Sequence, residues 1–378
     1  MVRLLSIQPV AERGGSDHAL LRLLRSLPSD EFECHVVVPS EPPLRAEFEK
    51  AGATIHVVPM RRISRSYGAR EWIAYAWLWP RSVREIRWLI RQLNIDVVHS
   101  NSLHSWYGWA AARRTRRPHL WHAREIVIQS PAALSVERLL TRRFATMVIC
   151  MSRAIAEQLN ARKVVVLYES VDADEFHPGL AGSFRSGVGI ADDVPLVGAA
   201  GRIDSWKGLD VLLDAFELAN AGQRPEARFE LVIAGATVAG KERLAVQLER
   251  RARALRGVHW LGPRDDLPAV LADLDLFVLP STAPEPYGLV VVEALACGVP
   301  CVVSNAGGVV EIAVAAPAGA AGVVPPGNPH ALAAALRTRL DPNAARSAAQ
   351  RAARPSLAPR VPAGAFASLV REISRAGR

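Results

Sequence analysis

The sequence contains no long apolar run. No stretch approaches the roughly 18–20 apolar residues that a helix needs to span a bilayer. The first residues, MVRLLSIQPVAERGG, also lack the long apolar core and the small-residue cleavage site of a signal peptide. Neither a membrane-spanning protein nor a secreted precursor is therefore expected, and we predict a cytoplasmic location.

Cysteine is scarce as well. The 378 residues include only Cys34, Cys150, Cys297 and Cys301, which do not form the disulfide framework of a small secreted protein. The spacing of Cys297 and Cys301 would suit a metal or redox pair, but no further Cys/His cluster accompanies them. We predict reduced, buried cysteines, no metal site and no requirement for a cofactor.

Lysine is rare, since only four of the 46 basic residues are Lys. The net charge of +9 is concentrated in residues 1–190, where 26 Lys and Arg face 18 Asp and Glu, a net of +8. A basic surface suits nucleic acid, an anionic membrane or an anionic substrate. The sequence shows no nucleic-acid-binding module, so we do not expect a nucleic acid partner.

What the sequence does contain is a regular alternation of short apolar runs with helix-length segments. The runs fall at residues 2–9, 34–39, 53–60, 95–102, 119–126, 146–152, 163–168, 195–203, 229–236, 257–262, 276–281, 300–305 and 321–326. Such runs are typical of parallel strands buried on both faces. They predict two doubly wound α/β domains, separated by the Gly-rich and acidic stretch 169–194.

The segment GRIDSWKG (201–208) follows one of these predicted strands. It places Arg202 and Lys207 beside the expected start of a helix at Leu209. Helix amides and two cations favour negative charge, and ligands of open α/β sheets bind beyond the carboxyl ends of the strands. The segment therefore predicts a diphosphate site, although a solvated loop with ordinary basic residues is an alternative that this motif alone leaves open.

The segment APEPYGLVVVEALACGVP (283–300) places two acids around the start of an apolar helix. Glu285 precedes the helix and Glu293 lies inside it, where an uncompensated carboxylate would cost roughly several kcal/mol. Gly288 would let a ligand approach the backbone and the first helix amides. A carboxylate at Glu293 can bind two ribose hydroxyls. The alternative places Glu285 on the loop surface and Glu293 on a solvated helix face.

Three further loops at predicted strand ends give weaker signals. A Gly pair at 307–308 opens another strand-to-helix turn, and Gly14–Gly15 follows the first strand, with Ser16 or Asp17 expected to cap the next helix. His122 lies at the end of the fifth run. A histidine within a strand is commonly a packed core residue, but its place at a carboxyl end makes a role toward a ligand plausible.

These motifs together resemble a known family. GRIDSWKG, then PSTAPEPYGLVVVEALACGVPCVVSNAGGVVE and AGVVPPGNPHALAAAL, resemble the donor-binding half of the family-4 retaining glycosyltransferases of the GT-B fold. Gly14–Gly15 and His122 occupy matching places in the other half. The resemblance implies two Rossmann-like domains with parallel sheets that face each other across a cleft. We place the acceptor-side domain at 1–170 and the donor-binding domain at 171–361, with a terminal helix, 362–378, docking back on the first.

The resemblance also implies an activity: transfer of a sugar from a nucleotide-diphosphate donor to an acceptor hydroxyl, with retention. The acceptor would be a glycan, a glycolipid or a natural product. The catalytic residues it implies are His122, Arg202, Lys207 and Glu285. The donor-binding residues it implies are Gly14, Gly15, Gly288, Leu289, Val290 and Glu293. Arg202 and Lys207 would neutralise the departing phosphate, Glu293 would bind the ribose, and Glu285 would bind the sugar.

Two features depart from the family pattern. Glu169-Ser170 stands where the family has the N-G of N-G-V-D, which changes the backbone angles that the domain junction can reach. The strings DAD (172–174) and DLD (273–275) match the acidic motif of metal-dependent glycosyltransferases. Because one lies in the linker and the other just before a strand, we take both matches as accidental.

Other functions remain open. A sugar-nucleotide epimerase or hydrolase could use the same fold, and a nucleic-acid-binding protein could use the basic half. Within residues 61–93, one helical face carries Arg84, Arg87 and Arg91, and another carries Val83, Ile86 and Ile90. This pattern favours a helix packed on the core with a solvated basic face. An interfacial helix is the alternative, and it would suit an anionic or membrane-associated acceptor and a peripheral position on the inner membrane face.

Overall fold

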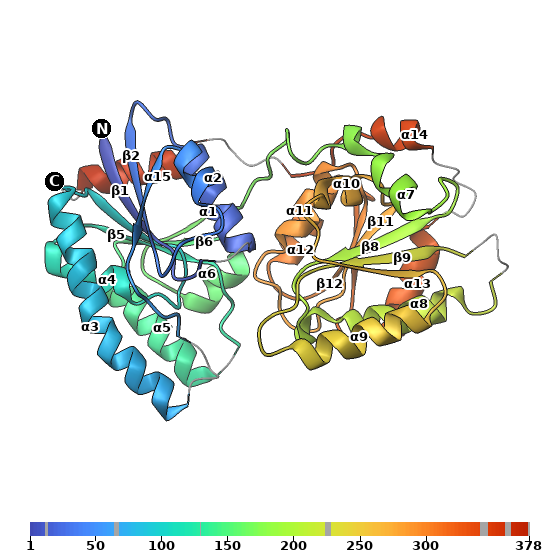
Figure 1. Cartoon of the computed structure of the whole chain (residues 1–378), viewed down its shortest axis with the longest axis horizontal. Helices are drawn as coiled ribbons and strands as arrows, with labels where there is room; N and C mark the ends of the chain where they lie inside the picture. Colours follow the sequence, from blue (N-terminus) through green and yellow to red (C-terminus); the bar gives the residue numbers. More distant parts are fainter. Residues whose placement is uncertain are drawn as a thin grey trace. The chain divides into compact units, whose positions relative to one another are not determined.

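The computed structural model describes residues 1–11, 14–63, 68–128, 130–223, 228–340, 347–359 and 364–376. The chain divides into two compact units, the first formed by Met1–Glu169 with Val361–Arg378 and the second by Ser170–Arg360. Each unit is built on one parallel sheet with helices packed against it (Figure 1). Each of the thirteen predicted apolar runs corresponds to one strand, which confirms the α/β prediction.

The first sheet has seven strands in the order β3-β2-β1-β4-β5-β6-β7. Their bounds are β1 Val2–Ile7, β2 Phe32–Val38, β3 Ala53–Val57, β4 Val97–Ser100, β5 His119–Ala123, β6 Met147–Cys150 and β7 Val164–Val166. The strand order reverses between β1 and β4. In doubly wound sheets ligands bind at such a switch point, beyond the carboxyl ends of the strands. The loop that contains Gly14 leaves the sheet there.

Helices pack against both faces of this sheet. They are α1 Gly15–Arg25, α2 Arg45–Lys50, α3 Ala69–Gln92, α4 Tyr107–Thr115, α5 Pro131–Phe144, α6 Arg153–Leu159 and α15 Ala365–Ala376. Strand residues alternate between two cores because neighbouring side chains point to opposite faces. Leu4 packs in one core with residues of α1, α2 and α15, while Leu5 packs in the other with residues of α3 and α4.

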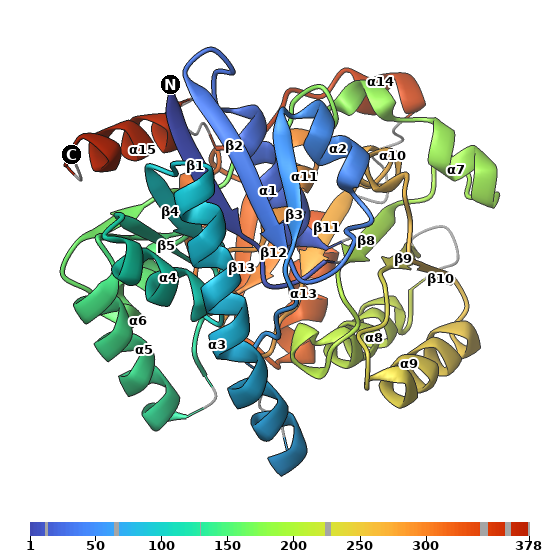
Figure 2. The ribbon, with the colours of Figure 1, turned by 60° about the vertical axis from the view of Figure 1, so that its left-hand side comes forward.

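The terminal helix α15 belongs to the first unit, although it follows the second unit in the sequence. It lies beside β1 in both ribbon views (Figures 1 and 2). Phe366 and Val370 are buried in the core that contains Leu4, and Arg371 donates to Glu31 at 2.7 Å. The predicted helix spanned 362–378, of which residues 362–363 and 377–378 lie outside the described part.

The second sheet has six strands in the order β10-β9-β8-β11-β12-β13. Their bounds are β8 Leu196–Ala200, β9 Glu230–Ala234, β10 Val258–Gly262, β11 Leu276–Leu279, β12 Cys301–Ser304 and β13 Ala321–Val324. The order reverses between β8 and β11. GRIDSWKG follows β8, and the loop with Glu285 follows β11, so both motifs leave the sheet at its switch point.

Two helices of this unit, α8 and α11, begin where the sequence predicted. The helices of the unit are α7 Ser183–Val188, α8 Leu209–Asn220, α9 Glu242–Ala254, α10 Leu267–Ala272, α11 Leu289–Ala296, α12 Val309–Ala315, α13 Pro329–Arg339 and α14 Ala348–Ala352, with short 3₁₀ turns at Pro178–Leu180 and Ser205–Lys207. In particular α8 begins at Leu209, directly after GRIDSWKG, and α11 begins at Leu289, directly after Gly288. Both first turns therefore lie at the switch point.

The acids of the DLD string are structural. Asp273 is fully buried, and its carboxylate accepts from the amides of Gly182, Phe184 and Arg185 at 2.6–3.0 Å. Asp275 accepts from Arg185 at 2.7 Å and from Arg354 at 2.9 Å. Both acids precede β11, at the end of the sheet opposite the switch-point loops. They fix chain segments from before β8 and after α13 onto the sheet.

All four cysteines are buried and unpaired, as predicted. Burial raises the pKa of the Cys34 thiol to about 11 and the pKa values of Cys150 and Cys297 to about 12. Thiols with such pKa values stay protonated near neutral pH and are poor nucleophiles and metal ligands. The four cysteines act as small apolar side chains in the interiors of the two units.

Candidate functional site

The loops after β8 and β11 bind each other at the switch point of the second sheet. The amide of Thr282 donates to the carbonyl of Trp206 at 2.8 Å. Gly208 has a positive φ of +67°, and a Cβ there would lie 2.1 Å from the carbonyl oxygen of Pro280. Only glycine satisfies both conditions. Gly208 thus lets the loop that carries Lys207 pack directly against the loop that leads to Glu285.

Replacing Gly208 with Ala tests this contact. The methyl group would clash with the backbone of Pro280, so we expect a loss of roughly 1–3 kcal/mol beyond the cost of the positive φ. Gly240→Ala is the matched control, because Gly240 also has a positive φ (+81°) but nothing within 4 Å of an added Cβ. Urea unfolding of both variants measures the difference. Equal losses would show that the close approach at Pro280 is unimportant.

Lys207 contacts two side chains of the described loops, Glu285 and Trp206. Its Nζ lies 2.8 Å from Glu285 Oε2 and 4.3 Å from the ring centre of Trp206. Ser281 donates its hydroxyl hydrogen to the same Glu285 oxygen at 2.8 Å. The side chains of Lys207 and Glu285 are 14% and 8% exposed, so the pair is largely shielded from solvent. This geometry excludes the two alternatives from the sequence, in which Glu285 lies on the loop surface and Lys207 is solvated.

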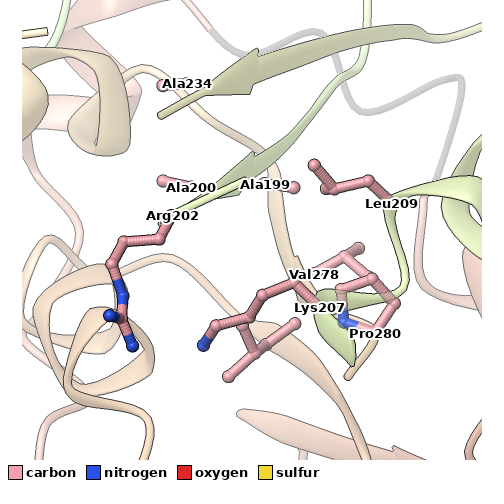
Figure 3. Close-up of a pocket in the computed structure, with 10 residues that line it drawn as sticks. Ala199, Ala200, Arg202, Lys207, Leu209, Ala234, Val278 and Pro280 are labelled. Atoms are coloured by element: carbon pink, nitrogen blue, oxygen red, sulfur yellow. The ribbon is translucent and has the colours of Figure 1, made fainter. Parts of the chain in front are cut away.

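Arg202 and Lys207 border one pocket. The space beside these residues is about 260 Å³, part of which is open to solvent. The pocket is lined by Ala199, Ala200, Gly201, Arg202, Lys207, Leu209, Ala234, Val278, Leu279 and Pro280. Figure 3 shows the charged ends of Arg202 and Lys207 directed to the same side of the strand ends. A guanidinium and an ammonium with this placement can bind an anionic group such as a diphosphate.

Two glycine contacts hold the neighbouring loops of this site. Gly307 has a φ of +81°, and a Cβ there would lie 2.3 Å from the carbonyl oxygen of Glu285. That carbonyl accepts from the amide of Gly308 at 2.7 Å, which fixes the backbone of Glu285. Sequence reasoning gave the 307–308 pair little weight. It missed Gly235, where a Cβ would lie 1.8 Å from the carbonyl oxygen of Gly201.

Helix α11 presents its amino-terminal end without a side-chain cap. The first-turn amides of a helix, here those of Leu289 and Val290, have no acceptor within the helix. Gly288 adopts a positive φ of +93°, and a Cβ there would contact Val309 at 3.0 Å. Packing and backbone conformation by themselves account for glycine at this position, and the approach of a ligand to this backbone stays a prediction.

Glu293 is buried, with 8% of the residue exposed. Its place in α11 rules out the solvated helix face that was the alternative. Its negative charge adds to the burial that raises the pKa of Cys297. Among the described residues, the lining of the pocket beside Arg202 includes no residue of α11. The structure therefore brings Arg202 and Lys207 to one pocket and pairs Lys207 with Glu285. Leu289, Val290 and Glu293 lie on α11, and Gly288 directly precedes that helix.

In the first unit, Gly14 and Gly15 lie at the start of α1. Gly14 is the residue before the helix, and no side chain caps it. The predicted cap at Ser16 or Asp17 is wrong, because α1 begins at Gly15 and both residues lie inside its first turn. An added Cβ at Gly15 would have nothing within 4 Å. Folding of the described chain therefore does not explain glycine at this position.

His122 is fully buried in β5. Its ring lies 5.6 Å from that of His99, and in the described part of the chain neither of its ring nitrogens has a hydrogen-bond partner. Burial, followed by the charge of Arg124, lowers the pKa of His122 well below its usual value, so the ring is neutral. Two unpartnered nitrogens are unusual inside a protein. A role toward a ligand stays a prediction, and it would require access to the ring.

Arg124 and Glu125, which follow His122 at the carboxyl end of β5, both make polar contacts. Arg124 makes a buried ion pair with Glu169, the first residue of the departure at the junction. Glu125 accepts from the amide of Leu103 at 3.0 Å and also binds the hydroxyl of Ser102. Glu169 thus neutralises Arg124, which a neutral residue at this position could not do. The sequence showed the departure but not the partner.

Two features are absent from the part of the chain that the structure describes. No group of three or more His, Cys, Asp and Glu side chains is placed to hold a metal ion. No helix in the ranges given above combines the length and the apolar character of a membrane span.

Comparison with known proteins gives matches for both halves of the chain. Residues 13–175 match the family described as Glycosyltransferase Family 4, and residues 183–355 match Glycosyl transferases group 1. D-inositol 3-phosphate glycosyltransferase of Mycobacterium leprae (strain Br4923) is 37% identical over 155 residues, 39% of this chain and 33% of the relative. The enzyme of that name from Mycobacterium sp. (strain KMS) is 30% identical over 238 residues, 56% of this chain and 52% of the relative. These alignments thus span about a third to a half of the relatives' length.

A solved structure shows the same fold over the whole chain. Anabaena Alr3699/HepE in complex with UDP-glucose superposes with a TM-score of 0.75 and 23% identity, covering 100% of this chain and 99% of that protein. The two Rossmann-like units are therefore those of the GT-B fold, as predicted.

Proposed function

The chain belongs to the glycosyltransferases of family 4, and on that premise we propose that it transfers a sugar from a nucleotide-diphosphate donor to an acceptor hydroxyl with retention at the anomeric carbon. The observation that carries the proposal is the placement of Arg202 and Lys207 on one side of a pocket at the switch point. Two cations there suit the diphosphate of the donor, since developing negative charge is stabilised best by preorganised positive groups.

The donor would bind along the loops after β8 and β11. Its diphosphate would contact Arg202, Lys207 and the first-turn amides of Leu289 and Val290 at the α11 amino terminus. Its ribose would bind the buried carboxylate of Glu293. Glu285 would accept hydrogen bonds from the sugar, because its Oε2 is already bound by Lys207 and Ser281 while its Oε1 has no hydrogen-bond partner among the described residues.

The proposed chemistry depends on charge and orientation. The bond between the anomeric carbon and the phosphate oxygen breaks, and Arg202 and Lys207 neutralise the negative charge that appears on the leaving diphosphate. The acceptor oxygen bonds to the anomeric carbon on the side of the leaving group, and its proton passes to the phosphate. No metal is part of this proposal.

A donor screen tests the proposal. Thermal unfolding is followed with UDP-, GDP-, ADP- and dTDP-sugars, because a donor at 100 times its Kd stabilises the folded state by about 2.7 kcal/mol. UDP-glucose is included because Alr3699/HepE was crystallised with it. We expect one nucleotide series to raise Tm. Donor conversion without any acceptor would favour the epimerase or hydrolase alternative, and no stabilisation by any donor would contradict the proposal.

Gly15 provides a prediction that separates a ligand role from a folding role. Gly15→Ala adds a methyl group that meets no described atom, so we expect stability to change by less than about 1 kcal/mol. If the donor approaches this backbone, kcat/KM falls roughly 5- to 150-fold, through about 1–3 kcal/mol of steric cost. Gly187→Ala, in α7, is the control, since its Cβ also meets nothing within 4 Å. Unchanged turnover in Gly15→Ala would remove Gly15 from the donor site.

A further inference from the structure

Helix α3 carries a stripe of exposed side chains along its whole length. We call these residues the outer stripe: Arg70, Ile73, Trp77, Arg81, Arg84, Trp88 and Arg91. They recur every three or four residues and therefore share one helix face. All seven are exposed. Four are arginines, three are large apolar residues and none is acidic.

The outer stripe is not the face that packs on the core. The core face consists of Tyr75, Ser82, Val83, Ile86, Leu89 and Ile90, all buried. At about 100° of helical rotation per residue, this face lies roughly opposite the outer stripe. The core-facing interpretation of the sequence is thus confirmed for Val83, Ile86 and Ile90. Packing on the core does not explain why Trp77 and Trp88 are exposed.

The apolar residues of the outer stripe are unusually accessible. Ile73 is 70% exposed, Trp77 68% and Trp88 57%. The guanidinium of Arg81 lies 3.0 Å from the ring centre of Trp77, so a cation and an aromatic face are presented together. Single exposed apolar residues are common on protein surfaces, but a row of them along one helix marks an interaction site.

The stripe is also long. From Arg70 to Arg91 it covers roughly 32 Å at 1.5 Å per residue. The first turns of α3 extend beyond the ends of the strands in both ribbon views (Figures 1 and 2). A row of this length fits an extended partner better than a small ligand.

We propose that the outer stripe of α3 binds the surface of an anionic membrane. Tryptophan prefers the boundary between lipid headgroups and acyl chains, where its ring is apolar and its N–H stays hydrated. Each arginine near an anionic leaflet contributes about 1 kcal/mol of binding. Nucleic acid would use the arginines, but Ile73 offers neither charge nor a ring for base stacking. An anionic membrane can interact with all seven residues, because its headgroups bind the arginines and its acyl region accommodates the tryptophans and Ile73.

Co-sedimentation with vesicles tests the surface without any sugar donor. The full chain is mixed at low salt with vesicles of phosphatidylglycerol and phosphatidylcholine, and separately with phosphatidylcholine alone. We expect binding to the anionic vesicles only, weakened by added salt. Arg81→Gln with Arg84→Gln should weaken binding roughly 25-fold, from about 1 kcal/mol per arginine. Trp77→Gln with Trp88→Gln should abolish the blue shift of tryptophan fluorescence that insertion causes.

Arg243→Gln with Arg250→Gln is the matched control, because both are exposed arginines on helix α9 of the second unit. It should bind like the unsubstituted chain, and all variants should keep its Tm. Three results would overturn the proposal: no binding to anionic vesicles at low salt, equal binding by the stripe variants, or stripe-dependent binding to RNA, DNA or a second copy of the chain in place of vesicles. Because no donor is present, these results are independent of those that test the glycosyl transfer.

Discussion

Lys207→Met is expected to lower kcat by about 10²–10³, the typical effect of removing one group that stabilises charge in a transition state. Methionine keeps the length of the side chain and removes its charge. The expected loss follows from the place of Lys207, which borders the pocket with Arg202 and is shielded from solvent. Charges act more strongly in such surroundings than in water. Steady-state kinetics with the best donor from the screen measure the effect.

The same substitution also affects stability, and this effect must be separated from the effect on kcat. Without Lys207, the buried carboxylate of Glu285 keeps only Ser281 as a partner among the residues that the structure describes, and the chain loses up to roughly 3 kcal/mol of stability. Adding Glu285→Gln removes the unpaired charge, so the double variant should regain most of that stability. Its turnover should stay low, because Lys207 is still absent and the carboxylate of Glu285 that would bind the sugar is also replaced.

Lys241→Met serves as the control for removing a lysine from this unit. Lys241 lies 3.7 Å from Asp204, and its side chain is 42% exposed. An exposed pair of this kind contributes about 0–1 kcal/mol, so we expect kcat within about threefold of the unsubstituted chain. Near-normal turnover in the double variant of Lys207 and Glu285 would show that Lys207 only supports the fold.

Asp273→Asn is expected to destabilise the second unit by about 3–5 kcal/mol, the range for breaking a buried ionic network. The fully buried carboxylate accepts three backbone amide hydrogens and lies 3.3 Å from Arg351 Nε. An amide in its place would direct an N–H group at other donors and leave Arg351 without its buried partner charge. For a unit of this size the loss corresponds to a decrease in Tm of roughly 6–20 °C.

Hydrogen exchange measured by mass spectrometry locates this effect. We expect faster exchange throughout residues 170–360 and unchanged exchange in the sheet of the first unit. Asp266→Asn is the matched control, since Asp266 forms an exposed pair with Arg264 and its loss should cost less than about 1 kcal/mol. If Asp273→Asn were as stable as Asp266→Asn, the network would not hold the segments before β8 and after α13.

The strands could be predicted from the sequence because parallel strands buried on both faces consist almost entirely of apolar residues. VRLLSI and LFVL are examples, and both form central strands of their sheets. The starts of α8 and α11 could be predicted because a glycine precedes each apolar helix. The cap of α1 could not, because Ser16 and Asp17 are both good capping residues, yet the helix begins one residue earlier, at Gly15.

Contacts between distant residues could not be predicted. Asp273 binds Arg185 and Arg351, which lie 88 and 78 residues away, and no periodic pattern connects such positions. The pairing of Lys207 with Glu285 across 78 residues became apparent only in the structure. Gly235 was missed because a single glycine after a strand is common and its close contact with Gly201 exists only in the folded sheet.

A crystal structure of the chain with its most stabilising donor bound tests the central claim most directly. We predict density for the diphosphate against Arg202, Lys207 and the first turn of α11, with the ribose hydroxyls on Glu293 and the sugar on Glu285. A donor bound elsewhere, with Arg202 and Lys207 directed away from its phosphates, would contradict the account.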